Sequence, residues 1–168
     1  TTDYFRGEYA YNGGACFVDS CARLVVDDTL FASNGMQLAN MSGSYYGYYG
    51  RLSGAALYAN ATPVVMRRSR IVANANGSGE GGSAISLGGN CSGSVFRNCA
   101  FVGHFERFGN CGDTANKHGG ALTIVLGSAA QTVDIEGCTF AYNVSAGYDT
   151  AAALNVLGGA VTVKDTIF

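Results

Sequence analysis

Apolar or small residues alternate with polar ones in two short stretches of the chain, and this pair of stretches recurs about five times. The clearest copy comprises residues 119–124 and residues 133–143. Alternation with a period of two predicts short β-strands that bury one face, and the 3.6-residue period of a helix is absent. The chain is therefore predicted to be all-β and to be built from repeats.

Alignment of the repeats brings similar residues into columns. In the second stretch, the main apolar column consists of Phe31, Ile71, Phe101, Phe140 and Phe168. Two positions earlier lies a column of small residues, namely Thr29, Ser69, Cys99, Cys138 and Thr166. Three positions after the apolar column lie Asn34, Asn74, His104 and Asn143. The first stretch contributes a column of Cys16, Leu57, Ile85, Leu122 and Leu154.

One repeat contains too little apolar surface to be stable alone, but stacked repeats would place each column in register, about 4.8 Å from one repeat to the next. This predicts a parallel β-helix that forms one domain over residues 1–168, with the long segments between repeats gathered on one edge. A fragment of, or a stacking unit in, a longer β-helix is the alternative. An antiparallel sandwich or barrel has equally short strands and glycine-rich turns. It is disfavoured because two-residue Asn-Gly or Asp-Gly hairpin turns do not separate these strands.

Two repeats pair the motif Gly-Gly-Ala-x with Phe-x-x-Asn, at residues 13–16 with 31–34 and at residues 119–122 with 140–143. The pairing resembles the repeats of polymorphic outer membrane proteins and related right-handed parallel β-helix adhesins. The other three repeats keep only parts of the motif. The resemblance covers nearly the whole chain and implies a right-handed parallel β-helix of about five coils. It implies little about activity, since such repeats occur in surface proteins of many kinds.

Charge gives no sign of a nucleic-acid or anionic-membrane partner, because the 168-residue chain has a net charge of −2 and only 13% charged residues. No apolar segment approaches the roughly 20 residues that span a bilayer. The first residues do not read as a signal peptide. We therefore expect that one was removed or that the chain begins inside a longer protein.

Six cysteines, an even number, favour a disulfide framework in an oxidising compartment. The predicted pairs are Cys16–Cys21, Cys91–Cys111 and Cys99–Cys138. The last pair shares a column on adjacent repeats, so its Cα spacing suits a disulfide. Small buried thiols at these two positions are the alternative. The spacings of cysteine and histidine do not predict a zinc site.

Five Asn-x-Ser/Thr sequons exceed the roughly two that chance would give from this composition. They lie at Asn40, Asn60, Asn76, Asn90 and Asn143. Their number favours N-glycosylation and, with the cysteines, a secreted, extracellular or cell-surface location. Accidental sequons in turns rich in serine and asparagine are the alternative.

Outward positions of the second stretch form a charged column, which consists of Asp27, Arg67, Arg97, Glu136 and Lys164. Three of its four neighbouring pairs are opposite in sign, which predicts a ladder of exposed ion pairs, each worth about 0–1 kcal/mol. A catalytic carboxylate pair formed by Asp134 and Glu136, which project from the same face, is the less favoured interpretation.

The aromatic residues divide into two groups. Those predicted to stack inside are Phe17, Phe31, Phe96, Phe101, Phe140 and Phe168. Others lie in the connections between repeats and are predicted to form an interface or ligand platform: Tyr45, Tyr46, Tyr48, Tyr49, Phe105, Phe108 and Tyr148. Tyrosine suits both protein interfaces and stacking against sugar rings. Loops that fold back and bury their own rings are the alternative.

Acidic residues are sparse, and no two repeats carry aspartate in one accessible column, as a calcium-dependent lyase or a paired-acid hydrolase would require. We expect no enzymatic activity, no cofactor and no metal. Phe168 closes a core strand without a polar cap, and no capping helix precedes the first repeat. The sequence therefore predicts a secreted structural glycoprotein that self-associates head to tail in a surface fibre or coat. The alternatives are an adhesin or glycan-binding module and, less favoured, a polysaccharide lyase or hydrolase.

Overall fold

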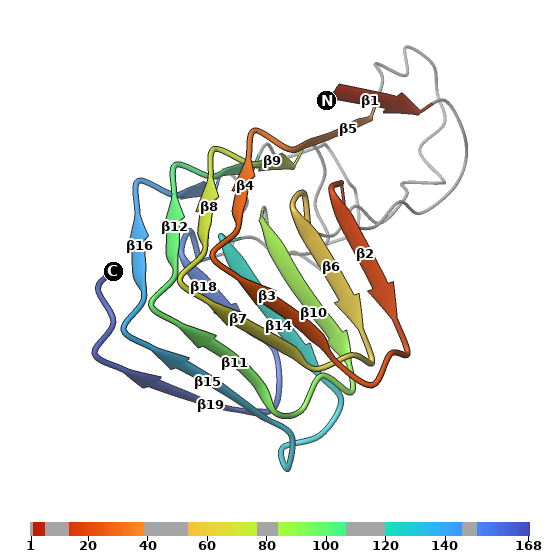
Figure 1. The fold of residues 1–168 in the computed structure, drawn as a ribbon, viewed down its shortest axis with the longest axis vertical. Coiled ribbons are helices and arrows are strands. Elements are labelled where there is room, and N and C mark those ends of the chain that lie inside the picture. The colour runs from red at the N-terminus through yellow and green to blue at the C-terminus, as the bar shows by residue number, and fades with distance from the viewer. Residues whose placement is uncertain (1, 6–13, 39–53, 77–83, 107–119, 146–150) are drawn as a thin grey trace.

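The computed structural model describes residues 2–5, 14–38, 54–76, 84–106, 120–145 and 151–168. Regular structure in these residues is entirely β-strand, and the strands form four sheets in which every pairing is parallel (Figure 1). The all-β class and the parallel arrangement predicted from the sequence are confirmed. Among these described residues, no helix is long and apolar enough to cross a membrane.

The sheets are numbered here in the order in which the chain enters them from β2. Sheet one contains β2 (Cys16–Asp19), β6 (Leu57–Asn60), β10 (Ile85–Gly89), β14 (Leu122–Leu126) and β18 (Leu154–Val156). Sheet two contains β3 (Leu24–Asp27), β7 (Val64–Arg67), β11 (Ser94–Arg97), β15 (Thr132–Glu136) and β19 (Ala160–Lys164). Sheet three contains β4 (Leu30–Ala32), β8 (Arg70–Val72), β12 (Ala100–Val102) and β16 (Thr139–Ala141). Sheet four contains β1 (Thr2–Phe5), β5 (Gly35–Leu38), β9 (Ala75–Asn76), β13 (Phe105–Glu106) and β17 (Val144–Ser145).

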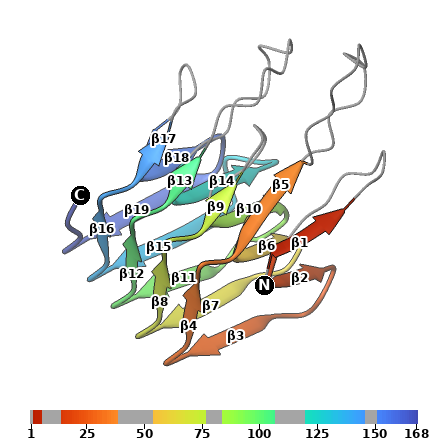
Figure 2. The same cartoon turned by 90° about the horizontal axis from the view of Figure 1, so that it is seen from above.

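Each of the first four repeats passes through sheets one, two, three and four in that order, and we call one such passage a coil. The fifth coil contributes β18 to sheet one and β19 to sheet two, and its Ile167 bridges to Thr139 of sheet three. Figure 2 shows equivalent strands of successive coils lying side by side. The predicted columns are confirmed by the strand register, in which Phe101 lies between Ile71 and Phe140, and Ile85 lies between Leu57 and Leu122. The long segments, residues 39–53, 77–83, 107–119 and 146–150, each link a strand of sheet four to a strand of sheet one.

The chain turns from one sheet to the next at residues with positive φ, and most of these are not glycine. The corner between sheets one and two has Ser20, Ala61 and Gly89; the corner between sheets two and three has Asp28, Arg68, Asn98, Gly137 and Asp165; the corner between sheets three and four has Ser33, Ala73, Gly103 and Tyr142. Side chains in this left-handed region are uncommon, and each costs roughly 1 kcal/mol or more. The stacked corners are therefore held by the strands on either side of them.

Inward-facing side chains of sheets one, two and three fill the interior. Its fully buried large members include Leu57, Met66, Ile71, Ile85, Leu87, Phe96, Phe101, Leu122, Ile124 and Ile135. Phenylalanine rings stack along the coils, with ring centroids 4.5 Å apart for Phe101 and Phe140 and 5.2 Å apart for Phe140 and Phe168. The middle coils are buried most completely, because each has a coil on both sides.

Candidate assembly surface

The charged column lies on the outer face of sheet two, as predicted. Its register runs Asp27, Arg67, Arg97, Glu136 and Lys164. Arg97 Nε lies 2.8 Å from Glu136 Oε2, and Arg67 Nη1 lies 3.7 Å from Asp27 Oδ2. All four side chains are about half exposed, so solvent screens these pairs and each contributes little to stability.

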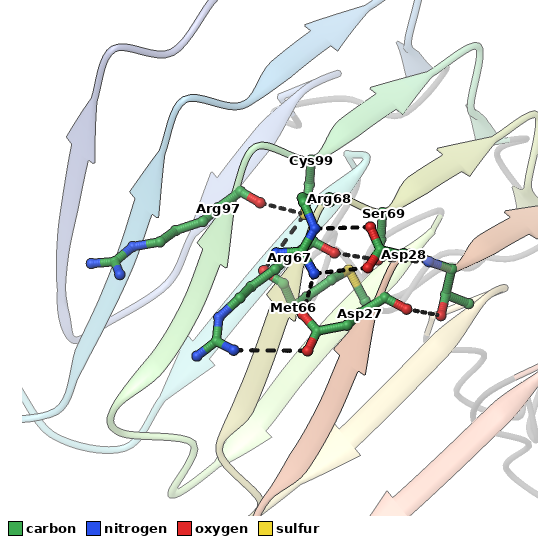
Figure 3. A network of polar contacts seen from close by, with 9 residues as sticks. Asp27, Asp28, Met66, Arg67, Arg68, Ser69, Arg97 and Cys99 are labelled. Atoms are coloured by element: carbon green, nitrogen blue, oxygen red, sulfur yellow. Dashed lines mark hydrogen bonds and ion pairs between the residues drawn. The ribbon is translucent and has the colours of Figure 1, made fainter.

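Beside this column, the corner between sheets two and three carries a tighter pair (Figure 3). Arg68 donates from Nε and Nη2 to the two carboxylate oxygens of Asp28, at 2.8 and 2.7 Å, and its Nη2 also lies 3.8 Å from Asp27. The bidentate hydrogen bonds from Arg68 lower the pKa of the Asp28 carboxyl. Both residues have positive φ, so the fork joins equivalent corners of adjacent coils.

These contacts do not favour acid–base chemistry. Glu136 is engaged by Arg97, while Asp134 is exposed two residues away on the same strand. Asp27 and Asp28 are both within reach of arginine. In the part of the chain that the structure describes, no group of three histidine, cysteine or acidic residues is placed to hold a metal ion.

The small-residue column forms a continuous ladder at the start of sheet three. Each side chain donates to the carbonyl two residues before it, with 2.8 Å from Thr29 Oγ1 to Asp27 and 2.8 Å from Ser69 Oγ to Arg67. From the second coil on, the side chain also accepts a backbone N–H of the preceding coil, as Ser69 Oγ does from Thr29 at 3.1 Å. Cys99 and Cys138 follow the same pattern, with Sγ 3.3 Å from the carbonyl of Arg97 and 3.5 Å from that of Glu136. Sulfur thus occupies the hydroxyl position of this ladder.

The predicted disulfides Cys99–Cys138 and Cys16–Cys21 are wrong for this structure, since all four cysteines are free thiols. Cys99 and Cys138 do lie in one column, and the interaction between their neighbouring thiols raises the pKa of Cys99 and lowers that of Cys138 to about 7. Cys16 packs against the core, whereas Cys21 is exposed beyond the next corner.

The third predicted disulfide, Cys91–Cys111, can be compared with the structure only at Cys91. Cys91 is a buried free thiol, and Cys111 lies outside the described residues. Cys91 Sγ donates to the carbonyl of Gly88 at 3.1 Å and accepts the N–H of Thr62. Cys21 N–H in turn donates to Thr62 Oγ1 at 2.9 Å. Cys21, Thr62 and Cys91 therefore form a second ladder of the same kind.

A double replacement tests this structural role of the thiols. Cys99→Ser with Cys138→Ser is expected to change the free energy of unfolding by no more than about 1 kcal/mol, because serine already occupies the ladder at Ser69. Loss of a native disulfide would instead cost about 2–5 kcal/mol. Urea denaturation of the double variant and the parent, each with and without reductant, separates the two cases. The matched control is Cys99→Val with Cys138→Val, which removes the donors and is expected to destabilise the protein more.

Asparagine and histidine form a third ladder at the start of sheet four. Asn34 N–H donates to Asn74 Oδ1 at 3.0 Å, and Asn74 Nδ2 donates to the carbonyl of Phe31 at 3.1 Å. Asn143 makes the same two bonds between the third and fourth coils. Its Oδ1 accepts the N–H of His104 at 3.1 Å, and its Nδ2 donates to the carbonyl of Phe101 at 3.0 Å. The side-chain nitrogen of Asn143 is thereby committed to the fold, which speaks against glycosylation at this sequon.

The remaining sequons differ in accessibility. Asn90 is exposed at the turn after β10, whereas Asn60 is partly buried and donates from Nδ2 to Asp19 at 2.9 Å. Asn76 lies in β9, and Asn40 lies outside the described residues. Among the sequons whose side chains the structure describes, at Asn60, Asn90 and Asn143, Asn90 is therefore the best-placed acceptor.

Most of the predicted aromatic platform lies outside the described residues, namely Tyr45, Tyr46, Tyr48, Tyr49, Phe108 and Tyr148. Phe105 is described, and it is exposed on β13. The prediction that Phe17 stacks inside is wrong: it points outward from β2, is half exposed and stacks on Tyr58 with ring centroids 5.7 Å apart. Its neighbours Cys16 and Val18 take the inward positions, so the alternation of the strand places Phe17 outside.

The coil formed by β18, β19 and residues 166–168 lies at one end of the stack, and we call its outer side the open edge. β18 and β19 are the outermost strands of sheets one and two on this side. The large apolar side chains exposed in this coil are Val156, Leu157, Val163, Ile167 and Phe168. Val163 is 41% exposed, whereas Ile135, its neighbour in the same inward column, is 1% exposed. The open edge thus presents core positions and strand backbone to solvent, a combination that favours pairing with another strand.

Comparisons with known proteins add no relative. No protein-family model matches the chain, and no curated protein or solved structure is significantly similar to it.

Proposed function

We propose that the chain is a right-handed parallel β-helix that serves as a non-enzymatic building block of an extracellular fibre or coat, assembled by end-to-end stacking. The observation that carries the proposal is the open edge, where the core columns of the last described coil are exposed, with Val163 41% and Phe168 64% exposed. The recurring path through four parallel sheets supports the β-helix, and the resemblance to polymorphic outer membrane protein repeats suggests its hand.

The polar groups support a structural role. The ladders of hydroxyl, thiol and amide groups bond one coil to the next, and the arginines of the charged column and its corner bind carboxylates of neighbouring coils. These side chains are used to hold coils in register, and enzymes that act on polysaccharides need acids free to transfer protons. The glycan-binding alternative stays a prediction, since most of its platform lies outside the described residues.

Secretion stays a prediction that the exposed sequon at Asn90 supports. One preparation tests both parts of the proposal: the chain secreted from a eukaryotic host, examined by sedimentation and electron microscopy, then by peptide mapping with and without enzymatic removal of N-glycans. We expect concentration-dependent rods that lengthen along one axis, and a glycan at Asn90. Monomers at every concentration would rule out the building block, and an unmodified Asn90 would remove the support for secretion.

A further inference from the structure

We infer that the open edge binds the first coil of a second copy of this chain in register, so that Lys164 of one copy lies over Asp27 of the next. The inference rests on the proposed function and adds to it the partner and the alignment of the contact. The first coil comprises β2, β3, β4 and β5, at the opposite end of the stack from β18 and β19 (Figure 1).

The strand order of the sheets fits such a contact. In sheets one, two and four the earliest strand lies at one edge and the latest at the other, and all pairings between them are parallel. Suppose that the second copy follows the open edge at the same spacing and rotation that relate one coil to the next. Its β2 would then lie beside β18 of the first copy, its β3 beside β19, and its β1 beside β17. Its β4 would lie beside residues 166–168, where Ile167 already bridges to Thr139 of β16. The backbone groups of the edge strands would then be paired, which removes the main cost of leaving a strand edge in water.

The inward columns match in chemistry as well as in position. The register would bring together Leu154 with Cys16, Val156 with Val18, Val161 with Leu24, Val163 with Val26, and Phe168 with Phe31. Each pairing repeats a contact of the kind already made inside the chain, where Phe140 stacks on Phe168. Apolar side chains that are now exposed, Val163 and Phe168 among them, would leave water.

Charge complementarity selects a second copy over an arbitrary strand. The charged column ends in Lys164 at the open edge and begins with Asp27 in the first coil, so stacking sets opposite charges side by side. Asp165 would approach Asp28, whose carboxylate is neutralised by the fork from Arg68.

The small-residue ladder continues across the same contact. Within the chain, Cys138 N–H donates to Thr166 Oγ1 at 3.4 Å, and Thr29 N–H donates to Ser69 Oγ at 3.1 Å. In the stacked pair, Thr166 N–H would donate to Thr29 Oγ1 of the next copy. Because unlike surfaces meet, each copy keeps one end free, and the assembly grows as an open filament when the rotation does not close.

Cysteine cross-linking tests the alignment without altering the charged pair. Thr162 and Val25 are exposed neighbours of Lys164 and Asp27, two residues earlier on the outer faces of β19 and β3. The variant Thr162→Cys with Val25→Cys places thiols that would meet only between copies, at a Cα spacing that a disulfide accepts. The matched control is Thr162→Cys with Leu30→Cys, where Leu30 is equally exposed but lies in sheet three. The parent chain gives the background from native cysteines.

Under mild oxidation we expect a ladder of covalent oligomers from the first variant on a non-reducing gel, and only background from the control and the parent. Equal ladders from both variants would overturn the alignment while end-to-end assembly stands. Sedimenting oligomers of the parent without any cross-linked ladder would likewise overturn the alignment alone. Monomers in sedimentation and no ladder would overturn both this inference and the proposed function.

Discussion

Replacement of Phe101 by alanine is expected to lower the free energy of unfolding by about 3–5 kcal/mol. Phe101 is fully buried in the third of the coils, where its ring stacks on Phe140 with centroids 4.5 Å apart and meets the edge of Phe96 at 6.1 Å. Truncation removes both ring contacts and leaves a cavity that the strands above and below, fixed by their backbone ladders, cannot fill.

The effect is large because each coil touches only its two neighbours. In such a stack the total stability is roughly a sum of intrinsic terms and nearest-neighbour interfaces, so damage in a middle coil weakens two interfaces at once. A loss of this size is a substantial part of the roughly 5–15 kcal/mol that stabilises a typical domain. Phe101→Leu keeps most of the apolar volume and is expected to cost less.

Equilibrium unfolding in urea measures this loss, with Leu30→Ala as the matched control. Leu30 lies on β4 of the same sheet but is 60% exposed, so its truncation should cost less than about 1 kcal/mol. If the two alanine variants lost similar stability, the aromatic column would not be the centre of the core, and the register of sheet three would need revision.

The columns of the stack could be predicted from the sequence because each repeats one class of side chain, whether apolar, small or charged, at equivalent positions. The strand register of Phe31, Ile71, Phe101 and Phe140 and the charged column on sheet two both follow from alignment of the repeats. Parallel stacking aligns identical positions, so aligning the repeats is equivalent to aligning the strands.

The number of sheets could not be predicted in the same way. What the sequence suggested as one second strand is two, separated by a corner at Asp28 and its equivalents. Most of these corner residues are Asp, Asn or Gly, which tolerate the left-handed conformation, but a single such residue inside a short apolar stretch does not by itself show that the strand ends there. Sheet four was missed because several of its strands, such as β9 and β13, have only two residues. Two residues cannot show a period.

The cysteines were misinterpreted although the needed signal was present. Cys99 and Cys138 stand in a column with threonine and serine, which indicates a shared hydrogen-bonding role at the start of sheet three. An even cysteine count favoured disulfides over that local pattern. The small-residue column was the better guide. Where threonine or serine fills the equivalent position in other coils, cysteine is expected to act there through what a thiol shares with a hydroxyl, namely the ability to donate and accept hydrogen bonds.

His104 is expected to make the protein lose stability in acid, by about 3 kcal/mol between pH 7 and pH 4. The side chain is buried, and burial lowers its pKa from 6.5 to about 4. Asn74 N–H donates to Nδ1 at 3.1 Å, so a proton on Nδ1 would break this hydrogen bond as well as bury a charge. The unfolded chain binds the proton more tightly than the folded one. Stability is therefore complete above the unfolded pKa and falls as the pH drops from 6.5 towards 4.

His104→Asn is expected to flatten this part of the profile without loss of stability at pH 7. Within the described residues, Nε2 of His104 makes no hydrogen bond of normal geometry, although the carbonyl of Ile71 occupies the equivalent acceptor position. Asparagine would restore the pattern of the other two side chains in this ladder. Asn74 donates from Nδ2 to the carbonyl of Phe31, and Asn143 donates from Nδ2 to the carbonyl of Phe101, in each case in the preceding coil. A buried donor left without a partner costs about 1–3 kcal/mol, so the variant should equal or exceed the parent at neutral pH.

Urea denaturation of the parent and His104→Asn at half-unit steps from pH 7 to pH 4 tests this expectation, because the carboxylates common to both proteins cancel in the difference. His118→Asn, at the second histidine of the sequence, is the matched control and tests whether any histidine produces the effect. Parallel profiles for the parent and His104→Asn would show that the ring is protonated equally easily in both states. The ladder at the start of sheet four would then be open to water at His104, and the buried asparagine-like role of this histidine would be wrong.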